Sequence, residues 1–332
     1  MSFKVTIIVP VFNTANYLHR CIESIKKINF QSYQVIFIDN CSSDGSYEIL
    51  KRNRNKRFKI LKNKKNYGQT YSLNKAIRLS NSPFIAIMDS DDICLKNRIK
   101  YSYDFLSNNS KFALVAGKSN TINENDQIIN FRRFTFKLNL INCRIFLDNP
   151  ISHTTIMFRK KIFKRLGGYS QKYKYTQDFD LLSRFLKNNY KIKVLNKHFT
   201  LVRKHKKQQS FKNKEKQDKE RYEIVIRNIQ RKTKLSKNII SLMKFVIFKK
   251  NKYFQKLSFK KQADIIDNIL KKLFSSNIER LYYCTLIFSQ NNNFNSILKF
   301  KILLKYIKLN KFLILDREIL LRILKSFLRI II

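Results

Sequence analysis

The sequence predicts a doubly wound α/β domain over its first half. Short apolar runs alternate with amphipathic stretches in units of about 30 residues, the length of a strand–helix–strand unit. The apolar runs are continuous, which is typical of strands buried on both faces of a parallel sheet. With 44% hydrophobic residues, the 332-residue chain can also bury a large core. We therefore expect a mostly parallel sheet flanked by helices.

The expected elements follow one another along the chain. Apolar runs predict strands at 4–9, 34–38, 59–61 and 84–88, the first of them ended by Pro10. Apolar spacing of three to four predicts helices over 14–28, from about Asp44, and over 71–79, with Thr14 as the N-cap of the first. Beyond residue 100 we expect strands at 112–115 and 154–158 and helices at 159–166 and 178–186. The basic stretch 204–220 predicts a boundary, followed by helices.

Composition narrows the class of protein. Lys and Arg number 69 against 22 Asp and Glu, a formal charge of +47, which favours an anionic partner such as a phosphorylated substrate, an anionic lipid or a nucleic acid. A generally basic, solvated surface is an equally open interpretation. The five cysteines are odd in number and form no CxxC, which fits a reducing compartment and argues against a disulfide framework or structural zinc. Neither a signal peptide nor an apolar stretch of ~18 residues is found, so we expect a cytoplasmic protein.

Polar clusters follow three of the predicted strands, at 10–13, 39–43 and 89–92. In an open parallel sheet, ligands bind beyond the carboxyl ends of the strands. These clusters should therefore meet at one edge and form a binding site.

Asp89, Asp91 and Asp92 lie within four residues of one another in a strongly basic chain. Carboxylates this close raise one another's pKa unless a positive charge compensates them. A hard divalent cation such as Mg²⁺ or Mn²⁺, shared with a substrate diphosphate, suits a site with few protein ligands. The alternative is that Asp91 or Asp92 only caps the next helix.

Seven short segments carry a resemblance to a known family. In chain order they are TIIVPVFN (6–13), IDNCSSDGS (38–46), NYGQTYSLN (66–74), MDSDD (88–92), GGY (167–169), TQDFDLLSRF (176–185) and VRKHKKQQS (202–210). Each is weak alone, but together and in this order they resemble the family 2 glycosyltransferases of the GT-A fold. That family uses nucleotide sugars and includes many bacterial polysaccharide and lipooligosaccharide enzymes.

The resemblance implies a Rossmann-like GT-A domain over residues 1–210 and a basic helical region over 211–332. It implies transfer of a sugar, with inversion, from a nucleotide diphosphate sugar (a UDP-sugar) to a glycan or lipid-linked acceptor. The expected setting is lipopolysaccharide or capsule biosynthesis, with the enzyme peripheral on the cytoplasmic face of the inner membrane. The expected cofactor is Mn²⁺ or Mg²⁺.

The resemblance also implies residue roles on the nucleotide side. Three consecutive residues would line the base: Pro10, Val11 and Phe12. Asp39 would accept a hydrogen bond from a base N–H, although it could instead be a turn residue that bonds its own backbone. Asn66 and Gly68 would close over the ribose or diphosphate, or else form only a turn. Asp44 fits a helix N-cap as well as a ligand.

The metal and phosphate roles fall on four residues. Asp91 would bind the metal between the two phosphates, and Asp89 would contact the ribose or the metal. His205 matches a late metal or diphosphate ligand of the family, and Arg203 would contact phosphate. The alternative for His205 is a solvated side chain in a basic stretch.

Asp178 is the general base that the resemblance implies, since an inverting transfer needs a carboxylate to take the acceptor proton. It could also be the N-cap of the helix 178–186, and both roles can hold together. The chain departs from the family at Gln177, where relatives usually have Glu, which puts the acceptor contact in doubt. It departs again at Leu73, where relatives tend to have Arg before the Asn that is Asn74 here.

The C-terminal residues 318–332 project apolar side chains on one side of a helix and basic ones on the other. Such a helix can lie on an anionic membrane surface, or it can pack onto neighbouring helices expected at 239–248 and 297–309.

Two other functions compete with sugar transfer. A phosphatase of the haloacid dehalogenase type would use Asp89 as nucleophile and Asp91 as acid, but it expects the DxD after the first strand of the fold, whereas three strand–helix units precede it here. A nucleic-acid-binding protein would account for the charge alone, yet it gives no reason for an acidic cluster. We therefore expect no nucleic-acid partner.

Overall fold

The computed structural model describes residues 3–131, 145–146, 148–206, 208, 211, 213–233, 258–274 and 280. The backbone divides into two compact units. The first comprises Met1–Phe134 and Ile151–Glu220, and the second comprises Thr135–Pro150 and Arg221–Ile332. The helices expected at 239–248, 297–309 and 318–332 lie outside the described residues.

A nine-stranded sheet forms the centre of the first unit, in the order β3-β2-β1-β4-β8-β6-β9-β5, with β7 paired to β6. The strands are β1 (Val5–Val11), β2 (Tyr33–Asp39), β3 (Phe58–Lys62), β4 (Phe84–Ile87), β5 (Ile93–Cys94), β6 (Phe112–Ile122), β7 (Ile128–Phe131), β8 (Met157–Arg159) and β9 (Lys191–Arg203). The first four strands in the chain are all parallel, as predicted. From β8 onward the sheet is mixed, because β8 is antiparallel to both β4 and β6, whereas β9 is parallel to β6.

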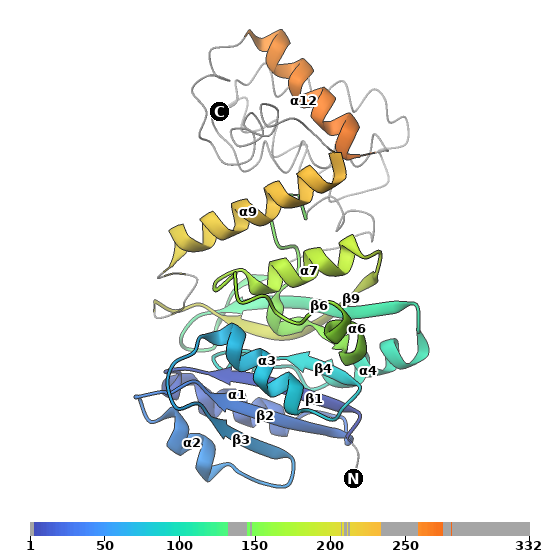
Figure 1. Cartoon of the computed structure of the whole chain (residues 1–332). Coiled ribbons are helices and arrows are strands. Elements are labelled where there is room, and N and C mark those ends of the chain that lie inside the picture. The colour runs from blue at the N-terminus through green and yellow to red at the C-terminus, as the bar shows by residue number, and fades with distance from the viewer. Residues whose placement is uncertain are drawn as a thin grey trace. The chain divides into compact units, whose positions relative to one another are not determined.

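Helices cover both faces of this sheet (Figure 1). One apolar core packs α1 (Ala15–Lys26), α2 (Ser46–Arg52) and α4 (Arg98–Asn108) against the side chains of alternate strand residues. The opposite core packs α3 (Gln69–Leu79), α6 (Lys160–Arg165) and α7 (Gln177–Lys187) against the other face. Every residue of β1 is buried, which accounts for its continuous apolar run.

The prediction that Pro10 ends the first strand is wrong. β1 continues to Val11, and Pro10 lies opposite Ile38 of β2. The strand on the other side of β1 is β4, and its pairing with β1 ends at Ile8. A proline, which has no N–H, is tolerated where a strand has a partner on one side only.

Beyond residue 100 the predictions are less complete. The helices expected at 159–166 and 178–186 are confirmed as α6 and α7. The strand expected at 154–158 is in part wrong, because His153–Thr155 form a 3₁₀ turn (η1) before β8 begins. Four elements have no counterpart among the predictions: α4, β5, β7 and β9. Strand β9 was not predicted because buried and exposed residues do not alternate regularly along its 13 residues, and lysines occupy some of the exposed positions.

The described part of the second unit contains helices and, at residues 145–146 and 148–150, turns and irregular backbone. Helix α9 (Lys214–Thr233) starts within the stretch 204–220 that was predicted to be a boundary, and it continues into the second unit. Helix α12 (Phe259–Leu273) is capped by Ser258, whose hydroxyl accepts from the Lys261 N–H at 3.4 Å. Among the residues that the structure describes, no helix is long and apolar enough to cross a membrane.

Candidate functional site

The carboxyl ends of β1, β2 and β4 lie side by side, as their parallel registers require. Pro10 and Val11 are buried within β1, whereas Phe12 is 40% exposed just beyond it. Val11 belongs to the apolar core, so a contact of this residue with a nucleotide base would come from its backbone. The nucleotide role of the three residues stays a prediction.

Asp39 is fully buried at the end of β2 and forms a turn. Its carboxylate oxygens accept from the Ser42 N–H at 3.2 and 3.4 Å, the local bond that was the alternative to nucleotide contact. Asn40, the next residue, donates from its side chain to Asn66 at 2.6 Å. The loop after β2 is thus tied to the loop before α3.

Asn66 also orders the start of α3. Its side-chain oxygen accepts from the Gly68 N–H at 2.9 Å, and Gly68 has φ +86, a value that favours glycine. Asn66 and Gly68 therefore form the predicted turn, and their contact with ribose or diphosphate stays a prediction.

Asp44 caps a helix, but one that precedes it in the chain. Its carboxylate accepts from the Ala15 N–H at 2.8 Å, at the start of α1, and from the Ser46 N–H and hydroxyl at 3.0 and 2.6 Å. Thr14 occupies the N-cap position of α1 without a side-chain cap bond, and its hydroxyl donates to Ser90 at 3.0 Å instead. The segments that follow β1 and β2 are therefore joined by Asp44, and the two polar clusters are joined directly by the bonds of Asn13 with Ser42 and Ser43.

The acidic cluster follows β4 directly. Burial, together with the charges of Asp91 and Asp178, raises the pKa of Asp89 to about 7, and burial with the charges of Asp91 and Asp89 raises the pKa of Asp92. The Oδ1 atom of Asp89 is buried and has no hydrogen-bond partner in the described part of the chain. The acidic side chains thus lie close together, and the hydrogen bonds they accept do not satisfy all of their buried oxygen atoms.

Arg98 lies behind the cluster and is 1% exposed. Its guanidinium donates to the carbonyls of Ile87 and Ile156 at 2.5 and 3.4 Å. Its charge favours the ionised form of Asp89, so it opposes the rise in the pKa of that carboxyl. Arg98 therefore supplies part of the compensating positive charge from inside the protein.

Strand β9 brings Arg203 and His205 to the same cluster. The Arg203 N–H donates to Asp92 Oδ1 at 2.9 Å, and its Nε donates to the Asp91 carbonyl at 2.8 Å. His205 Nε2 lies 2.9 Å from Asp91 Oδ2, while the buried His205 Nδ1 has no partner among the described residues. The structure thus joins the DxD segment to the VRKH segment, and the metal and phosphate roles of these residues stay predictions.

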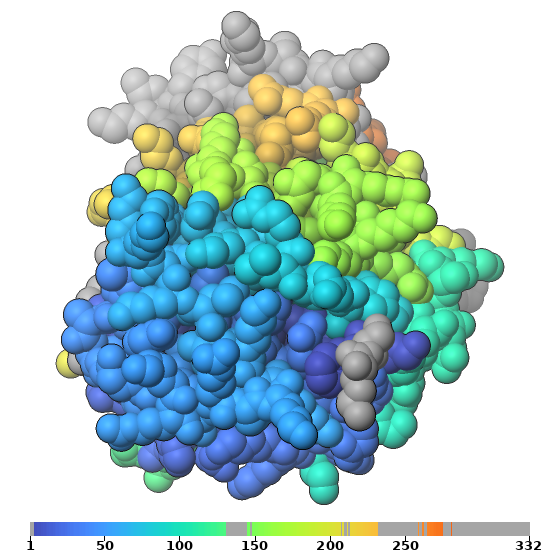
Figure 2. All heavy atoms as spheres, turned by 60° about the horizontal axis from the view of Figure 1, so that its bottom comes forward, coloured from blue at the N-terminus to red at the C-terminus, as the bar shows by residue number. Residues whose placement is uncertain are grey.

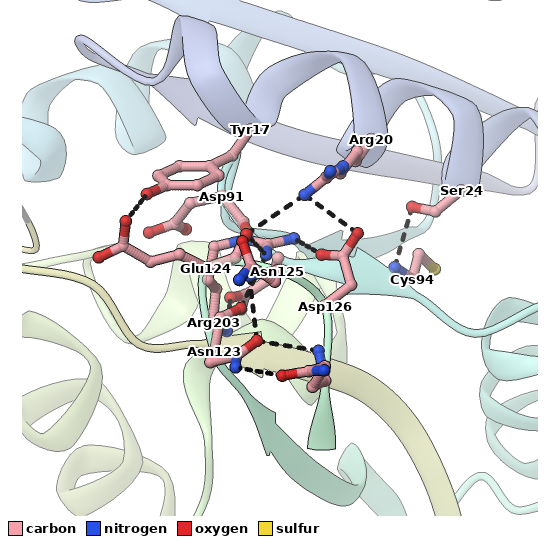
Figure 3. Close-up of polar contacts among 12 residues, drawn as sticks. Tyr17, Arg20, Ser24, Asp91, Cys94, Asn123, Glu124, Asn125, Asp126 and Arg203 are labelled. Carbon is pink, nitrogen blue, oxygen red and sulfur yellow. Dashed lines mark hydrogen bonds and ion pairs between the residues drawn. The ribbon is translucent and has the colours of Figure 1, made fainter. Parts of the chain in front are cut away.

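Arg203 is fully buried, and its guanidinium is already engaged. It forms an ion pair with Asp126 and donates to the carbonyls of Asn123 and Glu124 at 3.0 and 3.2 Å (Figure 3). A phosphate contact, which stays a prediction, would require Arg203 to exchange some of these partners. In the structure it binds the turn 123–126 to the acidic cluster.

Helix α1 closes this arrangement from the other side. Tyr17 and Arg20 point at the turn 123–126 in Figure 3, where Arg20 pairs with Asp126 at 3.1 Å and the Tyr17 hydroxyl donates to Glu124 at 3.2 Å. The Tyr17 ring lies 4.7 Å from the His205 ring, centroid to centroid, and 4.8 Å from the Arg203 guanidinium carbon. The orientation of His205 is therefore fixed by Asp91 and by Tyr17.

The expected divalent cation would need ligands from the acidic cluster and from His205. Within the described ranges, no group of three or more His, Cys, Asp or Glu side chains is arranged to hold a metal ion alone. Asp91 and His205 nevertheless converge, and the unpartnered Asp89 oxygen is an acceptor of the hard type that Mn²⁺ and Mg²⁺ prefer. The residues fit a cation that takes most of its ligands from phosphate and water.

Asp178 reaches the site from the opposite face of the sheet. It is the second residue of α7, partly exposed, and its charge acts on three neighbours: Asp89, His153 and Tyr169. His153 Nε2 lies 2.8 Å from the Tyr169 hydroxyl. Burial lowers the pKa of His153 and raises that of Tyr169, so both side chains are neutral at pH 7.

Residues 169–176, here called the α7-entry loop, are joined to α3. Asn74 Nδ2 donates to the Tyr169 carbonyl at 2.8 Å, and Asn74 Oδ1 accepts from the Tyr169 N–H at 3.0 Å. A Cβ on Gly168 would lie 2.9 Å from that same Asn74 oxygen, and φ at Gly168 is +72. On the surface, the paler blue residues around α3 lie between the darker blue N-terminal residues and the green residues that follow position 150 (Figure 2).

Sequence reasoning missed several of these side chains. Arg98, His153 and Tyr17 lie in no predicted motif, and Asn74 and Tyr169 were quoted only as members of motifs. Asn74 had one usable signal, since an Asn in a helix interior often makes side-chain bonds to backbone. The others become visible only when distant segments are brought together.

The chain is similar in sequence to a known protein family. The sequence model of Glycosyl transferase family 2 matches residues 6–167. The glycosyltransferase MJ1057 of Methanocaldococcus jannaschii is 30% identical over 196 residues, which cover 58% of this chain and 67% of that protein. The chain belongs to glycosyl transferase family 2. The phosphatase alternative is therefore replaced, and the chain is a glycosyltransferase of the nucleotide-sugar-dependent family.

One further relative and two solved structures are also similar to this chain. WfgD of Escherichia coli, a UDP-Glc:alpha-D-GlcNAc-diphosphoundecaprenol beta-1,3-glucosyltransferase, is 25% identical over 191 residues, which cover 57% of this chain and 72% of WfgD. The structure of S. aureus TarS 1–349 in complex with UDP-GlcNAc superposes with a TM-score of 0.58 at 18% identity, covering 92% of this chain and 89% of that one. The mannosyltransferase PcManGT from Pyrobaculum calidifontis, in complex with GDP-Man and Mn²⁺, superposes with a TM-score of 0.55 at 12% identity, covering 100% and 86%. These two structures confirm the GT-A fold.

Proposed function

We propose that this family 2 enzyme is an inverting transferase. It moves a sugar from a UDP-sugar to a glycan or lipid-linked acceptor in the synthesis of a bacterial surface polysaccharide. The observation that carries the proposal is the convergence of Asp89, Asp91 and His205 at the strand ends, with Asp178 close enough for its charge to act on Asp89. The donor and acceptor classes are supported by WfgD, whose name specifies UDP-Glc and a diphosphoundecaprenol acceptor.

The nucleotide would lie against the loops after β1 and β2, near Phe12 and Asp39, with the loop at Asn66 and Gly68 beside it. Asp91 and His205, with Asp89, would hold Mn²⁺ or Mg²⁺ beside the diphosphate. Such an ion supplies positive charge that stabilises the diphosphate as it leaves. Residues 1–210 would form the catalytic domain, and the basic region 211–332 would associate with an anionic membrane surface.

Asp178 accepts a proton in the proposed step. The acceptor hydroxyl passes its proton to the Asp178 carboxylate while its oxygen forms a bond to the anomeric carbon. The bond from that carbon to the diphosphate oxygen breaks on the opposite face, so the configuration inverts. Asp178 is the second residue of α7, so the first turn of that helix holds its backbone.

The first test is a screen of nucleotide sugars for Mn²⁺-dependent thermal stabilisation and for release of UDP. We expect Asp178→Asn to lower the rate of UDP release by about 10²–10⁴-fold, the usual contribution of a general base, and to leave nucleotide binding intact. Asp91→Asn should instead abolish the Mn²⁺-dependent stabilisation. Asp104→Asn, which changes an exposed acid on α4, is the control.

The proposal fails if no UDP-sugar stabilises the protein in Mn²⁺, or if Asp178→Asn retains its rate. Retention of configuration, measured by NMR as an α-linked product from an α-linked donor, would exclude the inverting step.

A further inference from the structure

One carboxylate from a distant helix holds the residues just before Asp178. Glu220 of α9 accepts four hydrogen bonds from the α7-entry loop. Its Oε1 accepts from the Lys174 N–H at 2.9 Å, and its Oε2 accepts from the Tyr175 N–H at 2.9 Å. The same Oε2 accepts from the Thr176 N–H and hydroxyl, each at 3.0 Å. Glu220 lies in the first unit, together with the loop.

This carboxylate holds the residues that lead into α7 and not the first N–H groups of the helix itself. The first N–H groups of a helix have no partner within it, and an N-cap side chain normally accepts from them. Thr176 is the N-cap of α7 but makes no side-chain cap bond, because its hydroxyl donates to Glu220. The negative charge of Glu220 is also favourable near the positive end of the α7 dipole. Glu220 thus fixes three successive residues that end two positions before Asp178.

The loop is held from its other side by α3. The Thr70 hydroxyl donates to the Tyr173 carbonyl at 3.2 Å, and Asn74 pairs with the backbone of Tyr169. On the α9 side, Gln217 Nε2 donates to the Tyr175 carbonyl at 3.2 Å. The loop therefore has fixed contacts on both sides, and Glu220 makes the largest number of them.

We propose that Glu220 is a positioning residue for sugar transfer, which sets the place of the Asp178 carboxylate through the backbone of residues 174–176. The inference rests on the proposed function of Asp178. Small displacements of a catalytic group lower the rate of the chemical step, whereas donor binding at β1, β2 and β4 does not involve this loop. Loss of Glu220 should therefore lower kcat and leave the KM for the donor unchanged.

The experiment compares Glu220→Gln, Glu220→Asp and the matched control Glu215→Gln, an exposed residue of the same helix. Glutamine keeps the length of the side chain but presents an NH₂ donor to N–H groups that need an acceptor. UDP release from UDP-glucose or UDP-N-acetylglucosamine in Mn²⁺ is measured well below the unfolding temperature of each variant. We expect kcat to fall about 10–100-fold in Glu220→Gln, with the donor KM within twofold, partial recovery in Glu220→Asp, and no change in Glu215→Gln.

Two further measurements separate positioning from a purely structural role. Amide hydrogen exchange of residues 174–176 should accelerate in Glu220→Gln and not in Glu215→Gln, a result that needs no turnover. In the Asp178→Asn background, Glu220→Gln should cause no further loss of rate, because both substitutions act on one group. Should Glu220→Gln fail to fold, Thr176→Val removes one of the four bonds and should lower kcat severalfold.

The outcomes distinguish this inference from the proposed function. If Asp178→Asn loses its rate and Glu220→Gln keeps it, the role of Glu220 is overturned and the proposed function stands. If Asp178→Asn keeps its rate, the proposed function fails, and the role of Glu220 in transfer fails with it. A loss in Glu220→Gln that is additive with Asp178→Asn, or that equals the unfolded fraction, would make Glu220 structural only.

Discussion

The nucleotide side and the base side of the candidate site are held together in different ways. On the nucleotide side, Asp39 bonds Ser42 three positions further along the chain, and Asn66 bonds Gly68 two positions along. On the base side, Asn74 bonds Tyr169 over 95 positions, and Glu220 bonds Thr176 over 44. The first side combines these local turns with bonds between loops that span 26 and 29 positions, at Asn40 and Asp44. The second side depends on single side chains that reach backbone 44 and 95 positions away.

The acidic cluster lies between these two sides and shares both features. It follows β4 directly, as local pattern predicts, yet its contact with Arg203 spans 112 positions. The nucleotide side should therefore tolerate single substitutions outside its turns and outside the bonds that join its loops. The base side should instead be sensitive to substitutions far from the chemistry.

The largest effect should come from Arg98, which supports the cluster from inside. Arg98→Met removes a buried cation and its bond to the Ile87 carbonyl, whereas the Ile156 carbonyl keeps the Ile87 N–H as a donor. We expect the free energy of unfolding to fall by roughly 3 kcal/mol, since an uncompensated buried charge remains. Urea unfolding measures this change. Lys100→Met, on the exposed side of the same helix, should leave the stability unaltered, and an equal loss in both variants would contradict the role of Arg98.

The mixed half of the sheet should be nearly as sensitive at one close contact. A Cβ added at Gly117 of β6 would lie 2.3 Å from the ring of Phe199, which is fully buried on β9. Gly117→Ala should therefore lower the free energy of unfolding by about 2 kcal/mol through overpacking. Adding Phe199→Leu should recover part of the loss, and a double variant with purely additive losses would argue against this clash.

The distinction between the two sides also decides what the sequence could predict. The four parallel strands and their helices were predicted because continuous apolar runs and helical spacing are local signals. The location of the site was predicted from the same signals, since parallel strands place Asp39 and Asp89 at the ends of β2 and β4, the two strands that flank β1. The contact of His205 with Asp91 was anticipated only through the family resemblance.

The remaining features lacked a local signal. Strand β9 mixes lysines with apolar residues because one of its neighbours, β5, is only two residues long. Glu220 lies in a stretch of alternating charges that was interpreted as a boundary, and nothing in those residues indicates that one carboxylate binds the backbone before α7. The catalytic roles of Asp178, Asp91 and Arg203 stay predictions.

A smaller effect should follow from Asn74, which joins α3 to the α7-entry loop. Asn74→Ala removes both bonds to the Tyr169 backbone, and we expect a loss of about 1–2 kcal/mol in the free energy of unfolding. Asn74→Asp keeps the acceptor for the Tyr169 N–H but sets an oxygen against the Tyr169 carbonyl. It should therefore be no more stable than the alanine variant. Arg78→Ala, exposed on the same helix, is the control in thermal unfolding.

The smallest effect should be a pH dependence centred on His153. Burial and the charge of Arg98 lower its pKa, the charge of Asp178 on α7 acts in the opposite direction, and Tyr169 is its hydrogen-bond partner. The unfolded chain then binds this proton more tightly than the folded one, so stability falls as the pH drops through the ordinary histidine pKa of about 6.5. His153→Asn should remove that slope, which for one proton is at most about 1.4 kcal/mol per pH unit. Urea unfolding between pH 7.5 and about 5 measures it, with His19→Asn on the exposed side of α1 as the control. An unchanged slope in His153→Asn would mean that other groups, on the nucleotide side, set the acid sensitivity of the fold.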